Sequence, residues 1–150
     1  MSGCSIRVLL SAVAVGFTLL LMSNKPTCAA EVRLGAGSAM ITIPTSWSVK
    51  EEPHFEWVRY YIKPRSAAQS RLRILLASTT NVQIDTRAKP YCLRGLHGFQ
   101  LTEDGLVKQT LALPFEQTFA GAIYFEYAQR DPQAAAVVKT FRVRGMRTRC

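Results

Sequence analysis

The side chains that could do chemistry in this sequence are few and scattered. Among its 150 residues are two histidines, His54 and His97, and four cysteines. The nearest combination is Cys92 with His97, which are the residue types of a thiol nucleophile and its base. Their spacing of five residues in a glycine-containing loop enforces no geometry, and an exported cysteine is more simply half of a disulfide. We therefore expect no enzyme active site here.

Metal and phosphate chemistry find no better support. Neither histidine has a second histidine, cysteine or acid at metal-ligand spacing, whereas a zinc site needs three or four such ligands. The acidic pairs Glu51–Glu52 and Glu103–Asp104 are explained by solvated surface and by a turn. No glycine-rich phosphate loop follows a strand. The sequence predicts neither a metal ion nor a cofactor.

The first 30 residues have the pattern of a secretory signal peptide. Arg7 precedes an uncharged apolar run over residues 8–22, which is shorter than the roughly 20 residues that span a membrane. We expect cleavage after Ala30, or one bond earlier, and a single exported domain over residues 31–150 that is periplasmic or secreted. A buried helix, an uncleaved anchor and a lipoprotein acylated at Cys28 remain as alternatives.

Cleavage would decide which cysteines the mature chain keeps. It removes Cys4 and Cys28 and leaves Cys92 and Cys150. Two cysteines in an oxidising compartment predict one disulfide, here between residues 58 positions apart. The alternatives are two free thiols or an intermolecular link through Cys150.

The elements that would position these residues are mostly strands. Alternating or β-rich segments bounded by turn residues predict strands at residues 40–44, 55–63, 71–78 and 121–129, with a hairpin turn at residues 103–105. Asp131 can cap a helix that Pro132 begins and Gly145 ends. We expect an α+β fold, in which an antiparallel sheet of about five or six strands carries the C-terminal helix on one face.

This order of elements also supports a family resemblance. The strand that runs into a proline and tryptophan turn, ITIPTSW, and the last strand with its terminal helix, AIYFEYAQRDPQAAAVVKTFRV, resemble the PsbP-like α/β/α sandwich. The resemblance covers nearly all of residues 38–145. It implies a non-enzymatic binding or assembly factor, and it transfers no site residue.

The positive charge of the chain is the feature that indicates a binding partner. The expected mature chain has 17 Lys and Arg against 10 Asp and Glu, a formal net charge of +7. Arginine suits bidentate contacts with carboxylate or phosphate groups. We expect a protein partner to contact an aromatic and arginine-rich surface made of Tyr60, Tyr61, Tyr91, Arg142, Arg144, Arg147 and Arg149.

Three other interpretations of the charge stay open. The first is an immunity or inhibitor protein that blocks an acidic enzyme cleft, and the second is a binder of anionic lipid or cell-envelope polymer. The third is a basic surface that only aids solubility. Nucleic acid is not expected as a partner outside the cytoplasm.

Overall fold

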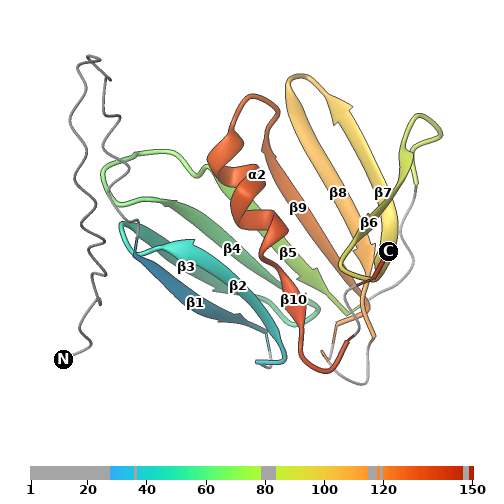
Figure 1. Cartoon of the computed structure of the whole chain (residues 1–150), viewed down its shortest axis with the longest axis horizontal. Coiled ribbons are helices and arrows are strands. Elements are labelled where there is room, and N and C mark those ends of the chain that lie inside the picture. Colours follow the sequence, from blue (N-terminus) through green and yellow to red (C-terminus); the bar gives the residue numbers. More distant parts are fainter. Residues whose placement is uncertain (1–27, 36, 79–83, 115–117, 119, 147–148) are drawn as a thin grey trace, which may run out of the picture.

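A large antiparallel sheet forms the back layer of the protein in a computed structural model (Figure 1). The structure describes residues 28–35, 37–78, 84–114, 118, 120–146 and 149–150. The large sheet has seven strands in the order β3-β4-β5-β9-β8-β7-β6. Their bounds are β3 Trp47–Pro53, β4 Trp57–Pro64, β5 Leu72–Ala77, β6 Lys89–Leu93, β7 Leu96–Glu103, β8 Leu106–Ala112 and β9 Ala122–Ala128.

A second layer lies in front of the large sheet (Figure 1). It contains a three-stranded small sheet in the order β1-β2-β10 and the helix α2, which contacts both β2 and β9. The bounds are β1 Ala29–Leu34, β2 Ala39–Pro44, α2 Pro132–Lys139 and β10 Arg142–Val143. We call the covered face of the large sheet its inner face and the opposite one its outer face.

The core fills the space between the two layers. In β5, Leu72, Ile74 and Leu76 are buried and alternate with Arg73 and Leu75, which confirms the predicted alternation. Phe125 of β9 meets Phe141 edge to face, with ring centroids 5.2 Å apart. Aromatic contact of this kind adds to the apolar area that is removed from water.

The expected fold class is wrong. Among the described residues the fold is mostly β, with sheets of seven and three strands instead of one sheet of five or six carrying a helix. The helix starts where predicted, because the Asp131 side chain accepts hydrogen bonds from the N–H groups of Gln133 and Ala134. It ends at Lys139 and not near Gly145.

Thr140 explains the early end of the helix. Its hydroxyl accepts a hydrogen bond from the Thr42 N–H at 2.8 Å and donates one to the Val137 carbonyl oxygen at 2.6 Å. The bond with Thr42 joins the end of α2 to β2. Arg142 and Val143 then pair with Met40 and Ala39, so the chain continues as a strand of the small sheet.

The predicted cleavage site falls inside β1. Ala29 and Ala30 pair with Pro44 and Ile43 of β2, so cleavage after Ala30 would leave a strand that starts at Glu31. The rest of the predicted signal peptide, residues 1–27, lies outside the described residues. Within the part of the chain that the structure describes, no helix is long and apolar enough to cross a membrane.

Candidate functional site

A row of small side chains crosses the outer face of the large sheet at one end. The strand register places Ala77 of β5 opposite Ala122 of β9, and Ala122 opposite Ala112 of β8. Residues directly opposite each other on neighbouring antiparallel strands point to the same face. Larger side chains, including Phe99 of β7, lie beside this row, so the surface is hollowed there.

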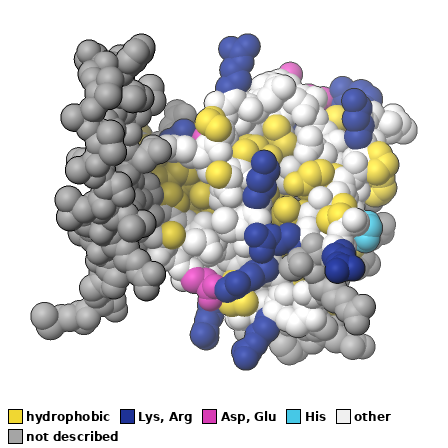
Figure 2. Space-filling model, viewed as in Figure 1, with side chains coloured by type: hydrophobic (Ala, Val, Ile, Leu, Met, Phe, Trp, Pro, Cys, Tyr) yellow, Lys and Arg dark blue, Asp and Glu magenta, His cyan; other side chains and the backbone are white. Residues whose placement is uncertain are grey.

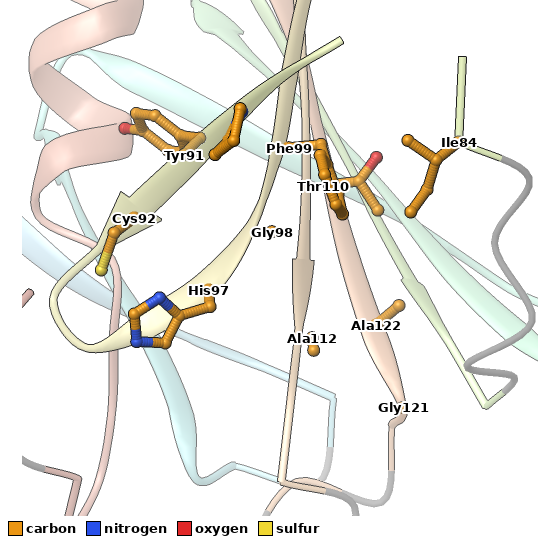
Figure 3. A pocket seen from close by; sticks show the side chains of 11 residues that line it. Ile84, Tyr91, Cys92, His97, Gly98, Phe99, Thr110, Ala112, Gly121 and Ala122 are labelled. Atoms are coloured by element: carbon orange, nitrogen blue, oxygen red, sulfur yellow. The ribbon is translucent and has the colours of Figure 1, made fainter. Parts of the chain in front are cut away.

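The hollow is a cavity of about 550 Å³, which we call the outer groove (Figure 3). This volume is within the range of ligand pockets in proteins. Its lining residues come from β6 to β9 and the segments next to them: Ile84, Pro90, Tyr91, Cys92, His97, Gly98, Phe99, Thr110, Ala112, Gly121 and Ala122. Ile84 faces Phe99 and Thr110 in the figure. The outer groove is therefore mainly apolar.

Gly98 brings two walls of the outer groove together. A Cβ atom at Gly98 would lie 1.9 Å from the carbonyl oxygen of Thr110 on β8, which no side chain can tolerate. Only glycine allows β7 and β8 to approach each other in this way. Tyr91 of β6 is the cross-strand partner of Gly98 on the other side.

The two residues with catalytic potential lie at one end of the outer groove (Figure 3). Cys92 forms a disulfide with Cys150, with Cα atoms 5.9 Å apart, so the predicted bridge is confirmed. While the bridge is intact, the Cys92 sulfur has no thiolate to act as a nucleophile. His97 is exposed and is the cross-strand partner of Cys92. The disulfide is compatible with an exported protein.

Arg142 and Arg144 of the predicted partner surface lie in and just after β10 of the small sheet, away from the strands that line the outer groove. Arg142 forms an ion pair with Glu31 across the small sheet, and Arg144 follows β10 and is exposed. Arg149 is exposed beside Cys150, whereas Arg147 lies outside the described residues. Figure 2 shows that basic side chains outnumber acidic ones on the face formed by α2 and the small sheet.

The three predicted tyrosines occupy three different environments. Tyr60 is 1% exposed, and its hydroxyl accepts a hydrogen bond from the Gly35 N–H at 2.7 Å. It belongs to the core and cannot contact a partner from the surface, which corrects its assignment to the partner surface. Tyr61 is half-buried on the outer face. Tyr91 is half-buried, packs against the core and lines the outer groove, and its burial raises the pKa of its hydroxyl.

Apart from Tyr61, the sequence reasoning missed a second cluster on the outer face. The Arg59 guanidinium lies 4.7 Å from the ring centre of Trp57, and His54 stacks on the same ring at 4.6 Å. Arg59 also donates a hydrogen bond to the Tyr61 hydroxyl at 3.3 Å. A cavity of about 430 Å³ continues past Arg73 and Tyr124. Aromatic and arginine side chains of this kind are enriched at protein interfaces.

The comparisons with known proteins leave the site to be interpreted from its geometry. No family model, curated protein or solved structure matches the chain. The resemblance to the PsbP-like family therefore stays a prediction. Among the described residues, no group of three or more His, Cys, Asp or Glu side chains is placed to hold a metal ion.

Proposed function

We propose that this protein is an exported, non-enzymatic binding module that recognises a protein partner through the outer face of its large sheet. The observation that carries the proposal is the outer groove, which offers about 550 Å³ of mainly apolar space. Interface energy is concentrated where a buried apolar or aromatic side chain fills such a pocket. The groove thus suits an apolar side chain of the partner.

The rest of the outer face supports the same function. Trp57, Tyr61 and Tyr124 are half-buried there, which leaves part of each aromatic surface open to a partner. Arg59 and Arg73 lie among them and supply charged donors for carboxylate groups, and Arg73 already binds Glu126 of this chain. This arrangement replaces the expected surface, because it uses Tyr61 with arginines of β4 and β5 and not those of the C-terminal segment.

Site-specific photo-crosslinking in the exporting cell tests the proposal. A photo-reactive phenylalanine analogue is introduced at Ala112, which is exposed in the outer groove, and in a matched chain at Ala128. Ala128 is exposed on the same face of β9 at the opposite end of the large sheet. We expect one discrete protein adduct from position 112 and none from position 128.

Two results would contradict the proposal. Identical adducts from both positions would indicate non-specific contact with the outer face. A lipid or polymer adduct at position 112, identified by mass spectrometry, would replace the protein partner by one of the other ligand classes that the basic charge allows.

A further inference from the structure

One aromatic side chain is almost fully exposed on the described surface. Phe55 is 98% exposed, in the turn between β3 and β4. The base of the turn is fixed, because the His54 N–H donates a hydrogen bond to the Trp57 carbonyl at 2.8 Å and the two rings stack. The ring of Phe55 therefore projects from an ordered hairpin. We call residues 51–57 the Phe55 hairpin.

The Phe55 hairpin is acidic, whereas the protein as a whole is basic. Glu51 and Glu56 are both exposed on either side of the phenylalanine. Glu52 is paired with Lys50, with 2.7 Å between the carboxylate and the ammonium group. The hairpin thus combines an apolar tip with local negative charge.

The rim of the outer groove has the opposite charge. Arg94 is exposed in the turn between the lining strands β6 and β7, and Arg149 is exposed next to Cys150, which the disulfide holds against the lining residue Cys92. The carboxylate nearest in sequence, Asp85, is bound by Arg87 at 2.6 Å and is neutralised by it. An acidic segment with an apolar tip therefore complements both the basic rim and the apolar interior of the outer groove.

The hairpin and the outer groove lie at the same end of the large sheet. Trp57 is paired with Ala77 and Ala77 with Ala122, which lines the groove. Two strand spacings, about 10 Å, separate Trp57 from Ala122. Two copies facing each other across this end could exchange their hairpins reciprocally, and reciprocal two-fold contacts are the commonest form of homo-oligomer.

We propose that the partner of the outer groove is a second copy of this chain, whose Phe55 inserts between Phe99 and the small residues Ala112 and Ala122. The inference rests on the proposed function, because it requires the groove to bind an apolar side chain of a protein. It adds the identity of that side chain and of the protein that carries it.

A complementation experiment tests the contact. Phe55→Asp removes the apolar tip and keeps the groove, whereas Ala112→Trp fills the groove and keeps the tip. Both positions are exposed, so neither change disturbs the core. By sedimentation velocity we expect the wild type to associate, each variant alone to be monomeric, and an equimolar mixture of the two variants to associate again.

Ala128→Trp is the matched control, since it adds the same side chain on the same face outside the groove. It should associate as the wild type does. Glu56→Lys should weaken association, and added salt should weaken the wild type. Circular dichroism and thermal melting of every variant check that the fold is kept.

The outcomes separate the inference from the proposed function. Self-association that survives both Phe55→Asp and Ala112→Trp would overturn the inference, as would a mixture that stays monomeric. A monomeric wild type together with a discrete adduct of a different protein at position 112 would overturn the inference and leave the proposed function standing. A monomeric wild type without any adduct at position 112 would overturn both.

Discussion

Asp131 is the residue whose replacement tests the structure most directly. Its carboxylate is buried and accepts hydrogen bonds from Arg71, with 2.6 Å to Nε and 2.9 Å to Nη2. It also caps α2 by accepting the N–H groups of Gln133 and Ala134 at 3.1 and 3.0 Å. Asparagine is as good an N-cap as aspartate, so Asp131→Asn removes the charge and keeps the cap, whereas Asp131→Ala removes both.

The expected losses of stability follow from separating the ion pair from the helix cap. A hydrogen bond to a charged group contributes about 1.5–3 kcal/mol to stability. The Arg71 side chain is 35% exposed, so we discount that range to about 1–2 kcal/mol for Asp131→Asn. Loss of the cap adds about 1 kcal/mol, which gives about 2–3 kcal/mol for Asp131→Ala. Urea denaturation at neutral pH measures both values.

The pH dependence gives a second test of the same ion pair. Burial raises the pKa of Asp131, but the hydrogen bonds from Arg71 and from the two backbone N–H groups outweigh it and hold the pKa below its ordinary value. A lowered pKa in the folded state stabilises the protein above the unfolded value of about 3.9, and this stabilisation is lost as pH falls through the folded pKa. The difference between wild type and Asp131→Asn should therefore shrink in acid.

A matched surface pair serves as the control. Arg73 binds Glu126 at 2.8 Å, but its side chain is 59% exposed, so Arg73→Gln should cost less than about 1 kcal/mol. The reasoning is refuted if Asp131→Asn costs no more than Arg73→Gln, or if its cost is unchanged between neutral pH and the acid limit of the folded protein.

Two further predictions concern the outer groove. Cys92→Ser with Cys150→Ser opens a loop whose ends are 58 residues apart, which should cost about 4 kcal/mol in urea denaturation from loop entropy. Intact mass should show that the wild type takes up two alkyl groups only after reduction, and alkylation before reduction would contradict the bridge. The same spectrum reports whether the exported chain starts at Glu31. Gly98→Ala places a Cβ atom 1.9 Å from the Thr110 carbonyl oxygen and should cost more than about 2 kcal/mol. Its control is Gly105→Ala, where the space around the added Cβ atom is open and only the positive φ of 74° causes strain. We expect this control to lose about 1 kcal/mol of stability. Equal losses of stability in the two variants would contradict the close approach of β7 and β8.

The sequence could reveal one of two similar hairpins and not the other. Asp104 and Gly105 connect β7 and β8 with φ values of 53° and 74°, as the predicted turn requires. Arg94 and Gly95 connect β6 and β7 with φ values of 50° and 84°. Arginine is an unusual residue at the first of these positions, so the second turn has no sequence signature and β6 could not be predicted.

The alternation of side chains along a strand limited what could be predicted about the two neighbouring tyrosines. The sequence predicts a strand over residues 55–63 and a partner surface that groups Tyr60 with Tyr61, but the structure places Tyr60 inside and Tyr61 on the outer face. Adjacent residues of a strand always point to opposite faces, but only the register with neighbouring strands decides which face is which. Grouping both tyrosines on one surface was therefore incompatible with a strand from the start.

The outer groove depends on contacts between strands that no local sequence pattern predicts. Ala77, Ala112 and Ala122 are small and unremarkable in sequence, and only the pairing of β5, β9 and β8 aligns them. The far wall is β6, the edge strand of the large sheet, which pairs with β7 alone in that sheet. The disulfide from Cys92 to Cys150 and the hydrogen bond from the Gly95 N–H to the Cys150 sulfur at 3.3 Å fasten the end of this strand and its turn to the C-terminal residue. A preorganised wall lowers the entropy lost on binding, so the disulfide supports the proposed binding site as well as the fold.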